Sequence, residues 1–116
     1  MAQGFWFGDQ HGGSTYEGAI TKVTLDGAQN LKFDYTFGSR SGGSGNFSGR
    51  IEGDTLTGTW TERYDGQDRV GEVDMQEATV TSAALTRRRF TGRYWLTKPQ
   101  PSHPDDVGKW TIEFDV

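Results

Sequence analysis

The sequence predicts an all-β fold, an eight-stranded antiparallel up-and-down β-barrel, from three observations. Apolar and polar residues alternate with a period of two in short segments, and Gly, Asp and Asn separate these segments. No segment keeps an apolar period near 3.6, so no helix is expected. Eight strands joined mostly by hairpins can curl until the first pairs with the last, which removes exposed edges. A two-sheet β-sandwich is the alternative.

Composition indicates one domain over residues 1–116. A chain of 116 residues can enclose one core, and 15 aromatic residues supply its bulk, since each buries roughly 150–250 Å². A mean hydropathy of -0.74 therefore does not imply disorder.

The charge and the N-terminus exclude several partners. A formal charge of -4 argues against nucleic-acid binding, which needs clustered positive charge. The N-terminus has no basic region and no long apolar run, so we expect neither a signal peptide nor membrane association. Without Cys there is no disulfide or thiol site, and a cytoplasmic protein is expected.

The first three expected strands cover residues 5–9, 15–25 and 31–37. Asp26 and Gly27 form a favourable hairpin turn between the second and third, because Gly accepts positive φ. The third has the clearest alternation in the chain. Its apolar face carries Leu31, Phe33, Tyr35 and Phe37.

Residues 38–45, GSRSGGSG, are expected to be a flexible loop that cannot pack. This loop is a candidate for a mobile lip over an opening of the barrel. A slack connector is the alternative interpretation.

A hairpin over residues 47–65 is the most recognisable stretch of the chain. Its arms, residues 47–51 and 55–64, meet at a tight turn around Gly53, and Gly49 and Gly58 permit the sheet to curl. One face of the second arm is expected to carry Leu56, Gly58, Trp60, Glu62 and Tyr64, and the opposite face Thr55, Thr57, Thr59 and Thr61.

Three further strands complete the expected barrel. Residues 69–80 form a polar strand whose inward face the sequence does not assign. Residues 85–97 alternate with Phe90, Gly92, Tyr94 and Leu96 inward. A proline-rich loop over residues 98–108 then leads to a last strand at 110–116, with Trp110, Ile112, Phe114 and Val116 on one face.

Two short motifs resemble the calycin group, which includes the lipocalin-like and avidin-like proteins. Residues 56–60, LTGTW, preceded by the turn at Gly53 and Asp54, are similar to a strand pattern of these small barrels. The first-strand sequence Gly4-Phe5-Trp6-Phe7-Gly8 is similar to their Gly-x-Trp. The resemblance implies an up-and-down barrel that binds a small molecule inside, and it supplies no site residue.

Alternation predicts an aromatic interior, made of Phe33, Tyr35, Phe37, Trp60, Tyr64, Phe90, Tyr94 and Trp110. Such walls with a few hydroxyl groups suit a planar or aromatic ligand. Alternatively, the rings simply fill a narrow barrel. The residues predicted to bind ligand are Tyr35, Trp60, Glu62, Tyr64, Arg88, Tyr94 and Trp110.

Glu62 and Arg88 are placed on the inward face by the same alternation. If both are interior, they must pair or find hydrogen bonds, and otherwise each reaches water at a barrel end. A set of Tyr, Arg and Glu resembles the active-site residue types of phenolic acid decarboxylases, which are lipocalin-like enzymes. The resemblance implies that Arg and Tyr hold a carboxylate while Glu transfers a proton.

Three functions follow as hypotheses. The first is binding of a small, largely apolar or aromatic ligand inside the barrel without catalysis. The second is a structural or protein-interaction module, which leaves a protein partner or a homo-oligomer open, and the third is an enzyme acting on an aromatic acid. No catalytic residue, metal site or cofactor is predicted, because His11 and His103 lie in no recognised ligand pattern.

Overall fold

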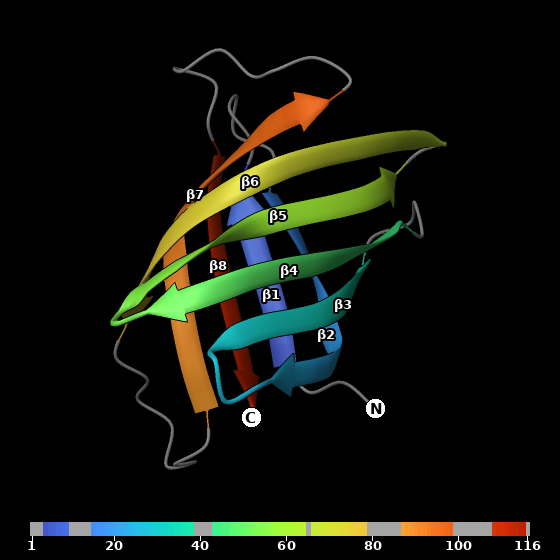
Figure 1. Ribbon diagram of the computed structural model, residues 1–116. Helices are drawn as coiled ribbons and strands as arrows, with labels where there is room; N and C mark the ends of the chain where they lie inside the picture. Colours follow the sequence, from blue (N-terminus) through green and yellow to red (C-terminus); the bar gives the residue numbers. More distant parts are fainter. Residues whose placement is uncertain are drawn as a thin grey trace.

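Eight antiparallel strands form a closed β-barrel. A computed structural model describes residues 4–9, 15–38, 43–64, 66–78, 87–98 and 108–115. The strands are β1 (Gly4–Asp9), β2 (Thr15–Leu25), β3 (Asn30–Phe37), β4 (Ser44–Glu52), β5 (Thr55–Tyr64), β6 (Gln67–Ala78), β7 (Arg87–Lys98) and β8 (Gly108–Asp115). Each strand pairs with the next, and β1 pairs with β8 (Figure 1). The predicted barrel is confirmed, and the alternative β-sandwich is wrong.

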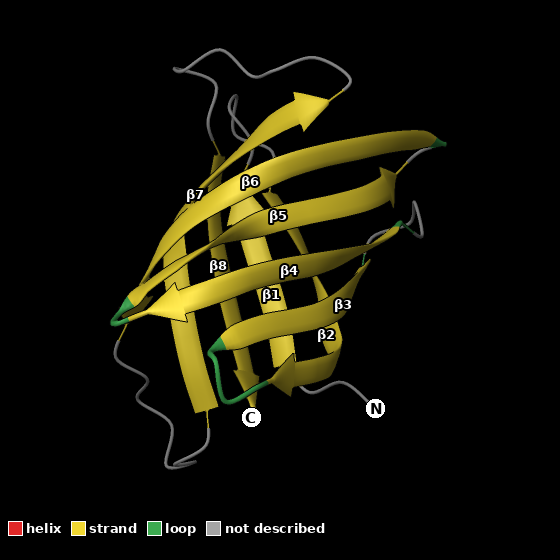
Figure 2. Ribbon diagram, in the orientation of Figure 1, coloured by secondary structure: helices red, strands yellow, loops and turns green. Residues whose placement is uncertain are grey.

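The described part of the chain consists of strands and short connections (Figure 2). Within it, no helix is long and apolar enough to cross a membrane. The strand β2 bends at Lys22, whose φ is 55°, where the pairing of β2 with β3 shifts register. Such a bulge increases the local twist that a closed barrel needs.

The segment between β3 and β4 differs from the prediction of a loop over residues 38–45. The strand β4 begins at Ser44, and Gly45 lies opposite Tyr35 of β3. The backbone N–H of Phe37 donates to the carbonyl of Gly43 over 2.9 Å. The hydrogen bonding between β3 and β4 therefore extends one residue beyond the start of β4. A glycine can occupy a strand where a large side chain of the neighbouring strand crosses it. Residues 39–42, the centre of the expected lip, lie outside the described residues.

The inward face of β6, which the sequence left unassigned, follows from the pairing. Trp60 lies opposite Gly71, and Leu56 lies opposite Met75. Directly opposed residues of antiparallel strands have their side chains on the same face of the sheet. The inward face therefore includes Arg69, Gly71, Val73 and Met75.

The two ends of the barrel contain different residues. We call the Glu62 end the one where β1, β3, β5 and β7 end, and the Leu56 end the one where these strands begin. Aliphatic and phenylalanine side chains fill the Leu56 end, and each is at most 4% exposed. They are Leu31, Ile51, Leu56, Met75, Phe90 and Phe114. Burial of each such side chain contributes about 1.5–3 kcal/mol to folding.

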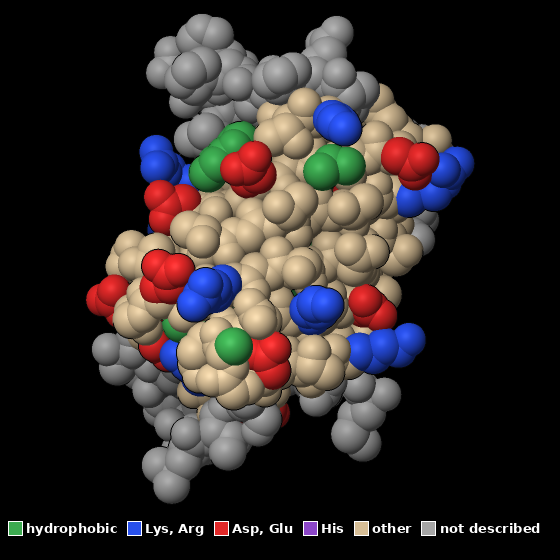
Figure 3. Space-filling view, viewed as in Figure 1, with side chains coloured by type: hydrophobic (Ala, Val, Ile, Leu, Met, Phe, Trp, Pro, Cys, Tyr) green, Lys and Arg blue, Asp and Glu red, His purple; other side chains and the backbone are tan. Residues whose placement is uncertain are grey.

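The outer face of β4 to β6 is polar. Thr57, Thr59 and Thr61 of β5 are exposed, as the sequence predicts. Figure 3 views the molecule from this side and shows mostly uncharged polar surface, with acidic and basic side chains interspersed and few hydrophobic ones. The alternation of β5 therefore separates a threonine surface from a core.

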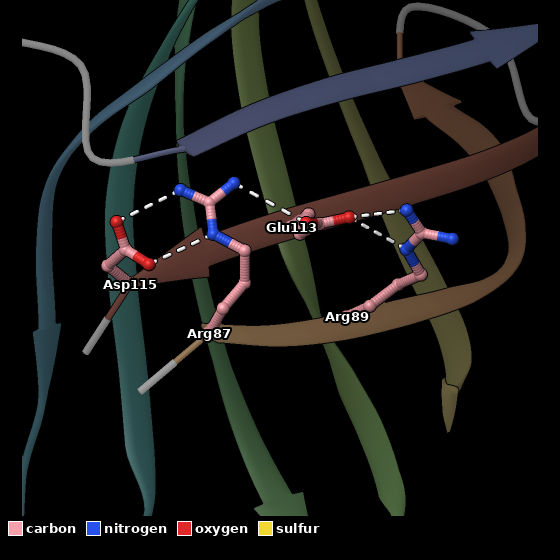
Figure 4. A network of polar contacts seen from close by, with 4 residues as sticks. All are labelled: Arg87, Arg89, Glu113 and Asp115. Atoms are coloured by element: carbon pink, nitrogen blue, oxygen red, sulfur yellow. Dashed lines mark hydrogen bonds and ion pairs between the residues drawn. The ribbon is translucent and has the colours of Figure 1, made fainter. Parts of the chain in front are cut away.

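An ion-pair network lies on the outer face where β7, β8 and β1 meet (Figure 4). Arg87 contacts both carboxylate oxygens of Asp115, each over 2.9 Å, and reaches Oε1 of Glu113 at 3.4 Å. Arg89 donates from Nε to Oε2 of Glu113 over 2.8 Å. Glu113 is only 5% exposed, and the guanidinium carbon of Arg87 lies 5.9 Å from the ring centre of Phe5. The network therefore links the last two strands beside the pairing that closes the barrel.

Candidate functional site

Pairs of an aromatic residue and a glycine line the inner face near the Glu62 end. Trp6 lies opposite Gly18 on the next strand, and Trp60 lies opposite Gly71. A Cβ atom on Gly71 would lie 2.1 Å from the Trp60 ring, and one on Gly18 would lie 2.6 Å from Trp6 Nε1. Each indole thus crosses the neighbouring strand in space that only glycine leaves free.

These two indoles reach backbone acceptors beyond the glycines. Trp6 Nε1 donates to the carbonyl of Thr36 over 3.0 Å. Trp60 Nε1 donates to the carbonyl of Glu72 over 3.2 Å. Both rings are almost fully buried, so these bonds satisfy N–H groups that water does not reach.

A third pair places a phenol against a carboxylate. Tyr35 lies opposite Gly45, and Gly45 lies opposite Glu62 on the following strand. The Tyr35 hydroxyl donates to Glu62 Oε1 over 2.9 Å. A Cβ atom on Gly45 would lie 2.6 Å from that hydroxyl oxygen, so the glycine leaves the space through which Tyr35 reaches Glu62.

The environment shifts the proton affinity of both groups. Burial raises the pKa of Glu62 above its ordinary value, although the bond from Tyr35 and the nearby charge of Arg69 oppose this shift. Burial, reinforced by the negative charge of Glu62, raises the pKa of Tyr35 well above its ordinary value. The hydroxyl therefore stays protonated as a donor, while Glu62 is the acceptor and the more readily titrated of the two.

Trp110 forms the fourth aromatic–glycine pair and occupies the centre of the barrel. It lies opposite Gly8, and a Cβ atom on Gly8 would lie 3.3 Å from Trp110 Cδ1. Its ring centre lies 5.6–6.5 Å from five other aromatic rings, those of Trp6, Phe33, Tyr35, Phe47 and Tyr94. The residue is 6% exposed, and its Nε1–H has no acceptor within the described strands and turns. Trp110 is therefore the member of the four pairs whose polar group is not satisfied there.

The predicted site residues separate into two groups. Tyr35, Trp60, Glu62, Tyr94 and Trp110 come together at the Glu62 end. The ring of Tyr94 is half-buried and lies 6.1 Å from that of Trp60 and 6.3 Å from that of Trp110. Tyr64 belongs to β5, but its side chain lies outside the described part.

Arg88 does not join this group, which corrects the predicted combination with Glu62. It lies near the start of β7, at the Leu56 end, whereas Glu62 lies near the end of β5. Arg88 forms two hydrogen bonds with Glu77, over 2.8 and 2.9 Å, and its guanidinium carbon lies 5.3 Å from the ring centre of Phe90. Strand alternation predicts a face but not which end of a tilted barrel a residue reaches, so the two charges were wrongly combined.

Arg69 and the glycines opposite the aromatic residues of this end, Gly8, Gly18, Gly45 and Gly71, were missed by the sequence reasoning. Arg69 lies opposite Glu62 on β6 and shares its face. Gly45 was placed in a loop, and Trp6 was absent from the predicted interior although it is 5% exposed. The recurring Trp and Gly residues are visible in the sequence, but their pairing depends on the register between strands.

Within the described ranges, no group of three or more His, Cys, Asp or Glu side chains could hold a metal ion. The only two histidines of the sequence, His11 and His103, lie outside those ranges. Comparison with protein-family models, with curated proteins and with solved structures found no match.

Proposed function

We propose that this protein binds a small, largely apolar or aromatic molecule at the Glu62 end of its barrel and does not catalyse a reaction. The observation that carries the proposal is the buried Trp110 N–H, unpartnered within the described residues, in a ring whose centre lies 5.6 Å from that of Tyr35, which is hydrogen-bonded to Glu62. Small-molecule sites combine apolar walls with a few polar groups that fix the ligand's orientation. The Glu62 end has both components.

The Trp110 ring sets where the ligand lies. Because this ring contacts aromatic side chains from four other strands, it fills the centre of the barrel. The ligand therefore lies against this aromatic layer, on the side of Glu62, and not in a channel that runs through the barrel. Half-buried inward-facing side chains surround that position, namely Tyr16, Phe37, Glu62, Arg69 and Leu96.

Contacts with the rings supply most of the binding free energy in this proposal. An aromatic ligand can meet the rings edge to face or offset, arrangements worth about 0.5–1.5 kcal/mol for each pair beyond the area that they bury. Glu62 supplies a hydrogen-bond acceptor, and Tyr35 holds its carboxylate in place. Little conformational freedom of Tyr35 is lost on binding, because the surrounding rings already hold its side chain in place.

Thermal unfolding with a panel of small aromatic compounds tests the proposal. A compound present at 100 times its Kd stabilises the native protein by about 2.7 kcal/mol, which raises the Tm measurably. Glu62→Gln should reduce the shift for compounds that contact the carboxylate. The matched control is Glu77→Gln, which removes a carboxylate at the Leu56 end and should leave the shift unchanged. No shift with any compound, or equal loss in both variants, would contradict the proposal.

A second candidate function is self-association through the outer face of β1. Phe5 and Phe7 are 38% and 45% exposed, and their stacked rings have centres 6.2 Å apart. Exposed apolar groups of this kind mark interaction surfaces when they are contiguous. Sedimentation of the protein and of a Phe5→Ser, Phe7→Ser variant tests this function. A dimer that only the wild type forms supports it, and a monomeric wild type at high concentration contradicts it.

Three sequence predictions stay predictions: membership of the calycin group, a cytoplasmic location, and an enzymatic role on an aromatic acid. The enzymatic role would need a cation beside Glu62 other than Arg88, and Arg69 is the residue placed there. Its test is conversion of a hydroxycinnamate by the purified protein. Turnover that Glu62→Gln abolishes in a folded protein would replace the binding proposal with this one.

A further inference from the structure

The unsatisfied N–H of Trp110 faces the first strand of the barrel. Glycines flank Trp110 on both neighbouring strands, Gly8 on β1 and Gly92 on β7. A Cβ atom on Gly8 would lie 3.3 Å from Trp110 Cδ1, whereas one on Gly92 would lie nearest to the backbone of Asp74 and Met75. Cδ1 is bonded to Nε1, so the edge of the indole that carries the N–H faces β1. This N–H is buried without an acceptor among the described residues, and nearly all buried donors in proteins are satisfied.

The residue on the other side of Gly8 is also aromatic. Tyr16 of β2 lies opposite Gly8, so Tyr16 and Trp110 share the inner face with a glycine between them. Tyr16 is half-buried, and its ring centre lies 6.4 Å from that of Phe37, which is half-buried too. The ring centre of Trp6, also on β1, lies 6.0 Å from that of Trp110. The N–H edge therefore borders an aromatic corner of β1, β2 and β8 at the Glu62 end.

A water molecule would find few partners beside this N–H. An ordered internal water makes about two to four hydrogen bonds. Of the five rings around Trp110, those of Phe33 and Phe47 have no polar atom, and the polar atoms of Trp6 and Tyr35 already form hydrogen bonds. A carbonyl oxygen that is attached to an apolar body needs only the one donor that Trp110 offers.

The surroundings of Trp110 favour a neutral acceptor over an anionic one. Glu62 at the same end is negative when ionised, and it accepts the hydroxyl of Tyr35, whose ring centre lies 5.6 Å from that of Trp110. Lys109 precedes Trp110 on β8 but belongs to the outer face, because successive residues of a strand point to opposite faces. A carboxylate beside Trp110 would thus find no cation among the described rings and glycines around it, and an unpaired buried charge is costly.

We propose, on the basis of the proposed function, that the ligand is a neutral aromatic carbonyl compound whose oxygen accepts the Trp110 N–H beside Gly8. Its ring lies against Tyr16 and Phe37, the half-buried rings of this corner. Recognition of the carbonyl depends on Trp110 and its neighbours on β1 and β2, and not on Glu62 of β5.

The test compares acetophenone with α-methylstyrene, in which a methylene group replaces the carbonyl oxygen on the same planar framework. Benzoate is the anionic counterpart. The ¹⁵N-labelled full-length protein is titrated with each compound, and the assigned indole N–H signals are followed by NMR. Trp110→Phe removes the N–H and keeps an aromatic ring. Trp60→Phe is the matched control, because the Trp60 N–H already donates to the carbonyl of Glu72.

We expect acetophenone to shift the Trp110 indole proton downfield and saturably, as a new hydrogen bond does, whereas α-methylstyrene should not move it downfield. Trp110→Phe should weaken acetophenone binding about tenfold more than α-methylstyrene binding, because only the ketone loses a hydrogen bond. Trp60→Phe should change both affinities by the same factor. Each compound is compared with itself across the variants, so its own transfer from water cancels.

Equal weakening of the two compounds in a folded Trp110→Phe protein, or tighter binding of benzoate than of acetophenone, would overturn the ligand class while the binding function stands. The absence of a downfield shift of the wild-type Trp110 signal with acetophenone would do the same, and this measurement decides the matter if Trp110→Phe does not fold. If none of the three compounds and no compound of the thermal panel binds, both proposals fail.

Discussion

The two ends of the barrel are built from the same strands and yet differ in what they bury. At the Leu56 end, the buried side chains are aliphatic or phenylalanine, and the charged residues that share their face, Arg88 and Glu77, hydrogen-bond to each other. At the Glu62 end, the inward side chains include a carboxylate, a guanidinium, phenols and indoles. A barrel of this size can be stabilised from one end, which leaves the other free to carry polar groups whose burial does not favour folding.

The charged groups of the two ends differ in the same way. Glu77 at the Leu56 end is paired with Arg88 on the neighbouring strand, and this pair lowers the pKa of Glu77. Among the residues that the structure describes, Glu62 accepts a hydrogen bond only from the neutral hydroxyl of Tyr35, and burial raises its pKa. The ion pair of Glu77 with Arg88 stabilises the fold. Burial of the Glu62 carboxylate instead lowers the stability of the fold, which is common for groups in binding sites.

Leu56→Ala is expected to have the largest effect on stability of the substitutions that test this difference between the two ends. Leu56 is fully buried, so the substitution should lower the free energy of unfolding by about 2–5 kcal/mol through the cavity that it leaves. Urea unfolding measures this change. The folded variant should still bind ligand with unchanged affinity. Lost affinity in a folded Leu56→Ala protein would contradict the claim that the Leu56 end stabilises the fold while the Glu62 end binds the ligand.

Glu113→Gln should have the next largest effect. Its carboxylate is buried on the outer face between Arg87 and Arg89, so losing its charge weakens two ion pairs and lowers the free energy of unfolding by about 1–3 kcal/mol. Denaturation in urea checks this value. Arg93→Gln is the control, because Arg93 forms an exposed pair with Asp74, and the change there should be within about 0.5 kcal/mol.

Gly45→Ala should lower the free energy of unfolding by about 1–3 kcal/mol through a disturbance of the Glu62 end. The new Cβ would lie 2.5 Å from Tyr35 Cζ and 2.6 Å from the carbonyl oxygen of Thr61, so the backbone or the phenol must move. The Tyr35 ring signals in NMR should shift along with the loss in stability. Gly27→Ala, where a Cβ would meet nothing within 4 Å, should be nearly neutral, and a similar loss in both variants would contradict the role of Gly45.

Much of this architecture follows from the sequence alone. The alternation of β3, β5 and β8 predicts both the strands and their inward faces, because a period of two leaves few other solutions. Closure is the arrangement that the sequence favours, since pairing the first strand with the last removes exposed edges, but the sequence alone leaves a two-sheet β-sandwich as the alternative.

The candidate site follows from the sequence only in part. The aromatic residues Tyr35, Trp60 and Trp110 and the acid Glu62 are recognisable as inward-facing, whereas Arg88 is wrongly combined with them. Their partners depend on register and on strand tilt, which a pattern along one strand does not contain. The contact of Trp110 with Gly8, for example, joins β8 to β1, which is remote in sequence.

The smallest expected effect is a pH dependence of opposite sign at the two ends. The folded pKa of Glu62 is raised from its ordinary value of 4.5, so its contribution to stability is fully present below pH 4.5 and is lost as the pH rises through the folded value. The folded pKa of Glu77 is lowered, so its contribution is present above pH 4.5 and is lost as the pH falls through the folded value.

Urea unfolding of Glu62→Gln and Glu77→Gln over this pH range measures both signs. Relative to wild type, Glu62→Gln should gain stability as the pH rises above 4.5, and Glu77→Gln should gain as the pH falls below it. A common sign for the two variants would show that the environments of the two carboxylates do not differ as described.

The most direct test of the central claim, that the Glu62 end is the binding site, is to map a bound aromatic compound by NMR on the labelled protein. The largest chemical-shift changes should fall on Tyr35, Gly45, Glu62 and the Trp110 indole, with Leu31, Leu56 and Phe114 at the Leu56 end unchanged. Changes centred on the Leu56 end or on the outer pair Phe5 and Phe7, or no saturable change with any compound, would contradict it.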